Sequence, residues 1–192
     1  MPWVQRPFPD TATLESALAG RPHPPVEGPG RPAAVMLCLH EREVLLLRRA
    51  TSPDDPWSGH ASFPGGRYDE GDAGLLGTAL RETQEEVGLE VQRHGRVVGA
   101  LGEYAGRGRG ISAIRIAAFV AVLDERPPLE LSSEVAAAYW VPLEQLVPGK
   151  VVVSELRGEV PAFPLVLDGE TLVVWGITYG ILEILRATGR EP

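Results

Sequence analysis

The chain contains a single cysteine, Cys38, among 192 residues, and it lacks both an excess of positive charge and a long apolar run. One cysteine excludes an internal disulfide and fits a reducing compartment. With 18 basic against 26 acidic residues the net charge is −8, which argues against general nucleic-acid binding because such proteins need a basic surface. No run approaches the length of a membrane span, and residues 1–10 lack the basic start and apolar core of a secretory signal peptide. We therefore expect a soluble, cytoplasmic protein that binds neither nucleic acid nor membrane.

The stretch from Gly65 to Leu89, GGRYDEGDAGLLGTALRETQEEVGL, combines a Gly-Gly turn, an acidic loop and an amphipathic helix. Asp72 stands where a side chain can cap the first free N–H groups of the helix, and Gly88 stands where a helix usually ends in a left-handed residue. At about 100° per residue, one stripe of the helix is predicted to be buried, and it contains Leu76, Ala79, Leu80, Thr83 and Val87.

Three glutamates, Glu82, Glu85 and Glu86, fall on an arc beside this stripe. Their like charges repel one another at the C-terminal end of the helix, at roughly 0.3–1 kcal/mol for each such term, and Arg81 offsets only part of this. A solvated acidic face is the simpler interpretation of an arbitrary helix of this kind. The Gly-Gly turn and the position beside the apolar stripe favour a metal site instead, because carboxylates on one face are the hard oxygen ligands that Mg²⁺ or Mn²⁺ prefers.

This stretch resembles the Nudix box, whose pattern is G-x5-E-x7-R-E-U-x-E-E-x-G-U, where U is an aliphatic residue. In the first half, Asp72 stands in place of the family's glutamate, and eight residues instead of seven separate it from Arg81. The extra residue is similar to the coenzyme A pyrophosphatase branch, in which GG-x-x-D-x-x-D followed by TALRE recurs. Thr83 replaces an aliphatic residue in the second half, which otherwise matches at Arg81, Glu82, Glu85, Glu86, Gly88 and Leu89.

The loop before the Gly-Gly pair is similar to the segment that precedes the box in the same branch, roughly L-L-T-x-R-S and then R-x-H-x-G-x-V-x-F-P-G-G. Gly59 and residues 62–66 keep the pattern, and Arg49 keeps the arginine of R-S. The histidine of the pattern falls on Trp57, and its second arginine falls on Asp55. These departures weaken the assignment to coenzyme A and leave diphosphate hydrolysis intact.

The rest of the chain has the pattern of a compact α/β protein. A composition of 44% hydrophobic and 23% charged residues suits one globular domain with a core of useful size. Residues 103–112 contain Gly-Arg-Gly-Arg-Gly, which is either a mobile phosphate-binding loop or a solubilising turn. The remaining predicted elements are a short helix over 10–19, a Pro/Gly-rich connector over 21–32, a β-hairpin of 33–40 and 43–49, strands over 91–102 and 114–123, and an apolar helix that ends near 186.

Two further segments extend the resemblance. Residues 129–146 are similar to a region of many Nudix enzymes in which a Glu-Val pair precedes a Trp-Val-Pro-Leu strand, which places Glu134 at a carboxylate that often faces the metal cluster from outside the box. The segment WGIT at 175–178 resembles a W-G-x-T segment of the coenzyme A branch. The resemblance implies an α/β/α sandwich around a mixed β-sheet, formed by residues 33–192 after an N-terminal helix and connector over 1–32. The residue pattern is compatible with this fold and with other α+β arrangements.

The resemblance implies metal-assisted hydrolysis of a diphosphate linkage. Glu82 and Glu86, one helical turn apart, are the expected pair for Mg²⁺ or Mn²⁺; Glu85 shares a second ion or acts through water, and the carbonyl of Gly66 is a further ligand. The general base is left open between Glu134 and Glu85. Arg81 is expected to orient the box glutamates, and the substrate-binding residues are expected to be Arg49, Arg67, Arg107 and Arg109.

The expected substrate is a nucleoside diphosphate derivative. Coenzyme A or an acyl-CoA would give 3′,5′-ADP and 4′-phosphopantetheine, and the alternatives are ADP-ribose, NADH or a dinucleoside polyphosphate. A non-catalytic nucleotide-binding module would be expected to have lost box carboxylates, which are all present here. An isopentenyl diphosphate isomerase would need an active-site cysteine, whereas Cys38 lies in an apolar strand and is predicted to be buried and inert. Homodimers are common among proteins of this kind, so a homodimer is possible.

Overall fold

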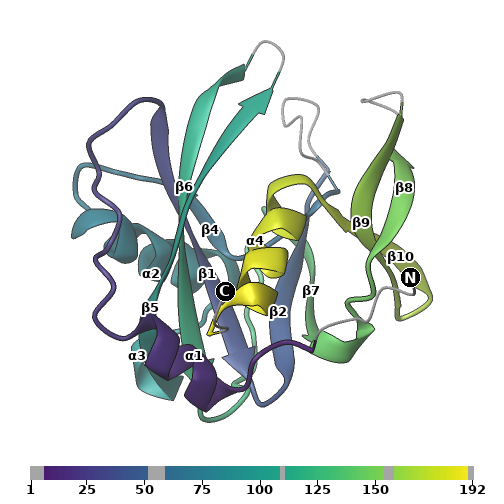
Figure 1. The fold of residues 1–192 in the computed structure, drawn as a ribbon, viewed down its shortest axis with the longest axis horizontal. Coiled ribbons are helices and arrows are strands. Elements are labelled where there is room, and N and C mark those ends of the chain that lie inside the picture. The colour runs from purple at the N-terminus through teal and green to yellow at the C-terminus, as the bar shows by residue number, and fades with distance from the viewer. Residues whose placement is uncertain (1–6, 52–58, 109–110, 154–157, 190–192) are drawn as a thin grey trace.

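The computed structural model describes residues 7–51, 59–108, 111–153 and 158–189 (Figure 1). Its elements, in chain order, are α1 (Thr11–Leu18), β1 (Arg31–His40), β2 (Glu43–Arg49), β3 (Ala61–Ser62), β4 (Gly65–Arg67), α2 (Gly74–Val87), α3 (Val91–His94), β5 (Gly95–Gly108), β6 (Ile111–Leu123), β7 (Val135–Pro142), a 3-10 helix η1 (Leu143–Gln145), β8 (Gly149–Val153), β9 (Gly158–Leu167), β10 (Glu170–Trp175) and α4 (Gly176–Ala187).

A mixed, seven-stranded sheet forms the centre of the molecule, in the order β3-β2-β1-β6-β5, with β4 also paired to β1 and β7 also paired to β2. The strands β1 and β6 run parallel along their whole length, from Arg31 opposite Ile114 to His40 opposite Leu123. The other pairs in this sheet are antiparallel. A separate antiparallel sheet has the order β10-β9-β8 and lies beside the main sheet (Figure 1).

The predicted hairpin of β1 and β2 forms, but the two strands pair only next to the turn, where Leu39 and His40 face Val44 and Glu43. Further along, β2 pairs with β7, and β4 pairs with residues 33–35 of β1. The two strands of the hairpin therefore part, and β4 brings the Gly-Gly pair into the sheet between them.

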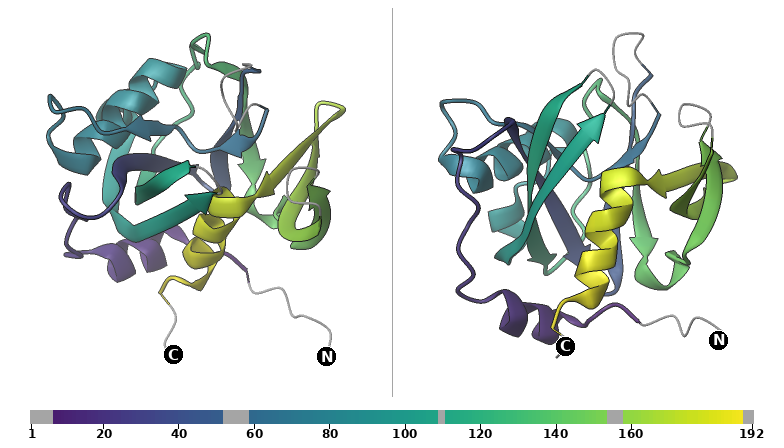
Figure 2. Two further views of the ribbon diagram at one scale, coloured as in Figure 1. Left: turned by 90° about the horizontal axis from the view of Figure 1, so that it is seen from above. Right: turned by 45° about the horizontal axis from the view of Figure 1, so that its top comes forward.

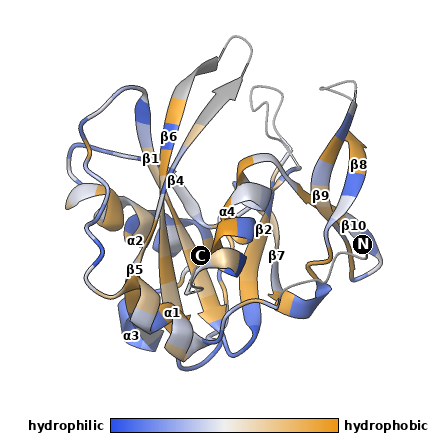
Figure 3. Cartoon of the chain, viewed as in Figure 1, coloured by the Kyte–Doolittle hydropathy of each residue, from blue (hydrophilic) through white to orange (hydrophobic). Residues whose placement is uncertain are grey.

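Helices cover both faces of the main sheet (Figure 2). Alternate residues of β1 belong to the cores on the two faces of the sheet, as expected for a strand buried on both faces. Ala34, Met36 and Cys38 belong to the core under α2, while Leu37 and Leu39 belong to the core under α1 and α4. The strands that form the layer between the helices are the most apolar part of the chain (Figure 3). The predicted α/β/α arrangement is confirmed, and Cys38 is fully buried as predicted.

The region after α2 differs from its prediction. The predicted strand over 91–102 begins with the short helix α3, so that β5 starts only at Gly95. The predicted loop over 103–112 is largely strand, because β5 continues to Gly108 and β6 already begins at Ile111. Gly102, at a φ of 150°, lies at one of three shifts in the register between these strands, which lets the glycine-rich chain stay paired while it bends.

The N-terminal segment is anchored to the main sheet. The predicted helix forms as α1 and is capped by Asp10, whose side chain accepts a hydrogen bond of 2.8 Å from the backbone N–H of Thr13. The connector after α1 has no regular structure up to residue 30. The buried side chain of Arg115 on β6 holds this connector, because it donates hydrogen bonds to the carbonyls of Pro25 and Val26.

The C-terminal part of the chain packs on the face opposite α2. Ile181, Leu182 and Leu185 of α4 belong to the same core as α1 and the inner residues of β9 and β10. An ion pair between Arg48 of β2 and Glu170 of β10 joins the two sheets. Over the residues described, none of the helices is both long and apolar enough to cross a bilayer.

Candidate functional site: the acidic end of α2

The helix α2 carries the three box glutamates, and a residue was predicted for each of its ends, Asp72 for the N-terminal cap and Gly88 for the C-terminal end. Its last turn ends at Gly88, which has a φ of 70° and donates its N–H to the carbonyl of Gln84 at 2.9 Å, as predicted. The prediction that Asp72 caps the helix is wrong. The helix begins at Gly74 without a side-chain cap, because the carboxylate of Asp72 is bound instead by Arg81 and by the hydroxyl of Thr78.

The buried face of α2 is turned slightly from the predicted stripe. Leu76 and Leu80 are only half-buried and lie at the margin of the core. The fully packed face contains Leu75, Thr78, Ala79, Thr83, Glu86 and Val87. Glu86 therefore lies within the face that packs on the sheet, and it is only 5% exposed.

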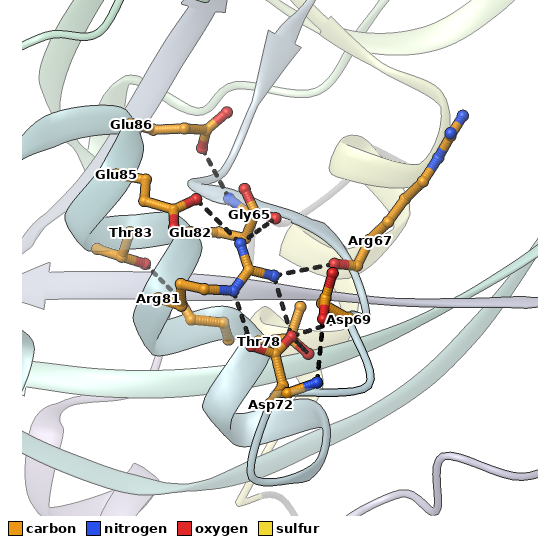
Figure 4. Close-up of polar contacts among 12 residues, drawn as sticks. Gly65, Arg67, Asp69, Asp72, Thr78, Arg81, Glu82, Thr83, Glu85 and Glu86 are labelled. Carbon is orange, nitrogen blue, oxygen red and sulfur yellow. Dashed lines mark hydrogen bonds and ion pairs between the residues drawn. The ribbon is translucent and has the colours of Figure 1, made fainter.

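Arg81 is the centre of a polar network between α2 and the acidic loop (Figure 4). Its Nε and Nη2 donate to the two carboxylate oxygens of Asp72 at 2.7 and 2.9 Å, and Nη2 also donates to the carbonyl of Arg67 at 3.1 Å. Its Nη1 donates to Glu82 Oε1 and Glu85 Oε2, each at 2.9 Å. The hydrogen bonds between Arg81 and Asp72 raise the pKa of the guanidinium and hold the pKa of the carboxyl below its usual range. Arg81 thus ties the loop to the helix and fixes two of the three glutamates.

The Gly-Gly pair lies directly against the carboxylates of Glu82 and Glu86. The N–H of Gly65 donates to Glu86 Oε2 at 2.9 Å, and Gly65 has a φ of 153°. A Cβ at this position would meet the carbonyl oxygen of Ala34, and a Cβ on Gly66 would lie 2.5 Å from Glu82 Oε1 and 2.6 Å from Oε2. Gly65 therefore requires glycine for the backbone to approach its neighbour this closely, whereas a side chain on Gly66 would displace the carboxylate of Glu82.

Burial raises the pKa of Glu82 and of Glu86, the two glutamates that lie against the Gly-Gly pair. It raises the pKa of Glu86 to about 7, helped by the negative charges of Glu82 and Glu134 and opposed by the Gly65 N–H and the positive charge of Arg49. Burial also raises the pKa of Glu82, against the hydrogen bond from Arg81. These interactions place Glu134 and Arg49 within electrostatic reach of Glu86. A backbone hydrogen bond also joins the segments that carry these two residues, because the N–H of Ala50, next to Arg49, donates to the carbonyl of Glu134 at 2.8 Å.

The carboxylate oxygens around Glu86 are ligands of the kind that a divalent cation needs. Carboxylates that lie close together and out of water repel one another, and a hard cation relieves both the repulsion and the desolvation. In the described ranges, no three histidine, cysteine, aspartate or glutamate side chains already converge on one point. The carboxylates are shared instead with Arg81 and the Gly65 N–H. The residues fit Mg²⁺ or Mn²⁺ by donor type, and the predicted ligand set of Glu82, Glu85, Glu86 and Gly66 stays a prediction.

The predicted substrate-binding arginines are placed differently from one another. Arg49 ends β2 near Glu86, whereas the exposed side chain of Arg67 extends away from the Arg81 network (Figure 4). The backbone of Arg107 lies in β5 and its side chain is outside the described parts of the structure, as are Arg109 and the two departures at Asp55 and Trp57.

Sequence reasoning missed two contacts of this site. The partner of Arg81 is nine residues upstream, so no helical spacing points to this pair, and Asp72 was singled out as a helix cap and by the resemblance without its contact to Arg81. The backbone N–H of Gly65 has no signature in the sequence, although the Gly-Gly pair indicated a close approach. The structure brings Arg81, Glu82 and Glu85 together, with Glu86 and Glu134 nearby.

Comparison with known proteins agrees with this geometry. The NUDIX domain family matches residues 29–158. The chain belongs to the Nudix family. An uncharacterised Nudix hydrolase, NudL of Cronobacter sakazakii, is 30% identical to this Nudix protein over 168 residues, which cover 84% of the chain and 85% of NudL. The mouse mitochondrial coenzyme A diphosphatase NUDT8 is 40% identical over 109 residues, which cover 54% of the chain and 48% of NUDT8.

The match to other relatives is partial. Of two further curated relatives, the alignment spans only 33% and 55% of the length. Among solved structures, the Nudix hydrolase RenU of Mycobacterium smegmatis superposes with a TM-score of 0.53 at 20% identity, over 82% of this Nudix protein and 84% of RenU. This likeness supports the fold, and the predicted family and fold class are both confirmed.

Proposed function

We propose that this Nudix protein hydrolyses a diphosphate linkage in a nucleoside diphosphate derivative, with Mg²⁺ or Mn²⁺ as cofactor. The observation that carries the proposal is the 5% exposed carboxylate of Glu86, bound by the Gly65 N–H beside the carboxylate of Glu82. A buried glutamate with so few partners lowers the stability of a fold. Its presence is explained if the site is completed by a cation that arrives with a phosphate group.

Each residue of the site has a role in this chemistry. Glu82 and Glu86 would hold the ion, together with the carbonyl of Gly66, while Arg81 keeps Glu82 and Glu85 in place. When bound, a divalent ion neutralises phosphate charge and makes a water molecule more acidic. Glu85 or Glu134 accepts the proton of the attacking water, and Arg49, near Glu86, contacts a phosphate of the substrate.

Coenzyme A is the first candidate substrate, since the mouse relative is named a coenzyme A diphosphatase. Cleavage would give 3′,5′-ADP and 4′-phosphopantetheine. The extra residue between Asp72 and Arg81 supports this branch, and the departures at Asp55 and Trp57 count against it. ADP-ribose, NADH and dinucleoside polyphosphates are the alternatives within the same chemistry.

The test is hydrolysis of coenzyme A, ADP-ribose, NADH and diadenosine polyphosphates with Mg²⁺ or Mn²⁺. Glu86→Gln should reduce the rate on the best substrate at least about a hundredfold, since even outer-shell changes at metal sites cost about 10–100-fold. The matched control is Glu90→Gln, because Glu90 is exposed and follows the helix by three residues. Equal rates for Glu86→Gln and Glu90→Gln would contradict the assigned site. Absence of hydrolysis with either metal, in a protein that binds these nucleotides, would favour a binding module.

A further inference from the structure

The WGIT segment at the start of α4 is joined to β3. Trp175 ends β10, and the next residue, Gly176, turns the chain into α4 with a φ of 62°. The hydroxyl of Thr178 donates to the carbonyl of Ala61 at 3.1 Å. The rings of Trp175 and His60 meet edge to face, with centroids 5.0 Å apart and planes at 72°. The segment therefore positions an aromatic ring pair at the edge of the main sheet.

This ring pair is close to the residues that serve the proposed phosphate site. The N–H of Arg49 donates to the carbonyl of His60 at 3.1 Å, so these two residues are neighbours across the strands. Side chains of such neighbours have Cβ atoms about 4.5–5.5 Å apart. Arg49 is in turn within electrostatic reach of Glu86, and β3 leads directly to the Gly-Gly pair. Arg49 therefore links the rings to the buried carboxylate.

Trp175 is also partly open to a ligand. The residue is half-buried, so part of it remains in solvent. In an edge-to-face pair, each ring keeps at least one face uncovered by its partner. Aromatic faces stack on nucleobases of any kind, with an effect on binding of about tenfold to hundredfold per base. A nucleoside whose phosphates lie at Arg49 and Glu86 would have its base within reach of this pair.

We infer that Trp175, held in place by His60, is a specificity-determining residue that stacks on the base of the nucleotide substrate. This inference rests on the proposed function and names the part of the substrate that the C-terminal segment recognises. The simpler explanation is a structural role, in which the ring pair only holds α4 against β3. A base contact and a structural role predict different affinities for ligands with and without a base.

The experiment compares the binding of AMP and of ribose 5-phosphate to the protein in the presence of Mg²⁺, by calorimetry. The two ligands share the phosphate and the sugar, so their difference in affinity reports the base. Wild type should bind AMP at least about tenfold more tightly. Trp175→Leu, which keeps apolar bulk but removes the aromatic face, should abolish this preference, and Trp175→Phe should retain most of it.

Trp140 provides a matched control. It forms a similar edge-to-face pair with His40, with centroids 6.5 Å apart, and it is paired with Leu45, at the other end of β2 from Arg49. Trp140→Leu should leave the preference for AMP unchanged. If Trp175→Leu does not fold, magnetisation transfer between the adenine protons and the Trp175 indole is measured in wild type, where contact is expected.

Four results would overturn the inference: no preference for AMP in wild type, a preference that persists in Trp175→Leu, loss of the preference in Trp140→Leu to the same degree, or no contact between adenine and Trp175. Because neither ligand contains a diphosphate linkage, no turnover is involved, and these results are independent of whether the protein hydrolyses diphosphates. With an active enzyme, Trp175→Leu should raise KM for nucleotides about tenfold and change kcat less than about twofold.

Discussion

Replacing Gly66 by alanine should separate the activity of the site from the stability of the fold. The new Cβ would lie 2.5 Å from Glu82 Oε1, whereas ordinary contacts begin at 3.4 Å, so the carboxylate must move by about 1 Å. The atoms that must move are the end of a flexible side chain, and Gly66 does not have a positive φ. The fold can therefore accommodate alanine, and the metal site cannot keep its geometry.

The expected magnitude follows from this displacement. A misplacement of about 1 Å in an active site reduces the rate by about a hundredfold. Glu82 also shares Arg81 with Glu85, so the shift disturbs a second candidate carboxylate. The free energy of unfolding should change by less than about 1 kcal/mol, since no core contact is lost. Hydrolysis of the best substrate at increasing Mg²⁺, and unfolding in urea, measure the two effects separately.

Alanine substitutions at two other glycines serve as comparisons for Gly66→Ala. Gly65→Ala should reduce both activity and stability, because its Cβ would strike the backbone of Ala34 at a φ of 153°. Gly180→Ala should retain activity and stabilise the protein by about 0.5–1 kcal/mol, because Gly180 is helical and has open space at its Cβ. Wild-type rates and metal dependence in Gly66→Ala would refute the assignment of Glu82 to the metal site.

Three further predictions concern charge, burial and metal. Asp72→Asn should lower the free energy of unfolding at pH 7 by about 1–3 kcal/mol. Because the pKa of folded Asp72 is below its ordinary value of 3.8, the stabilisation by its carboxylate is complete above about pH 4 and is lost as the pH falls further. The free energies of unfolding of variant and wild type, measured in urea, should therefore converge in acid. Burial raises the pKa of Cys38 to about 12, so a disulfide reagent at pH 8 should modify only the unfolded protein, and rapid modification of the native protein would contradict the buried position. At a hundred times its Kd, Mg²⁺ should stabilise the wild-type protein by about 2.7 kcal/mol and so raise its thermal midpoint. Chelation should reverse this effect. Equal stabilisation of Glu86→Gln by Mg²⁺ would exclude Glu86 as a ligand.

Local features of the site could be predicted from the sequence because their causes are local. The left-handed end of α2 at Gly88, the cap of α1 at Asp10 and the turn between β1 and β2 depend on residues within a few positions of one another. The partner of Arg81 could not be predicted in this way. Asp72 can be a helix cap or an ion-pair partner with the same residue spacing, and only the path of the acidic loop decides between them.

The sheet was predictable only where the strands are unbroken apolar runs, as in β1 and β2. Glycine and arginine in 103–108 are typical of a loop, yet the strand β6 supplies a complete partner for this segment, and tertiary pairing overrides composition. The small sheet was not predicted at all. Pro161 and Pro164 lie inside β9, and proline normally argues against an interior strand. Here both prolines are exposed, and the strand accommodates them.

The position of Glu86 connects the fold to its chemistry. Thr78 and Thr83 lie on the same buried face, and their hydroxyls bond to Asp72 and to the carbonyl of Ala79, so the polar groups of this face are satisfied within α2 and its loop. Glu86 is the exception, because the one hydrogen bond that its side chain accepts within the described parts of the chain, from Gly65, does not offset the burial that raises its pKa to about 7. The apolar contacts of Leu75, Ala79 and Val87 fix the rotation of the helix, and this rotation keeps the carboxylate out of water. The stability of the core is therefore what holds Glu86 in the unfavourable environment that a divalent cation would relieve.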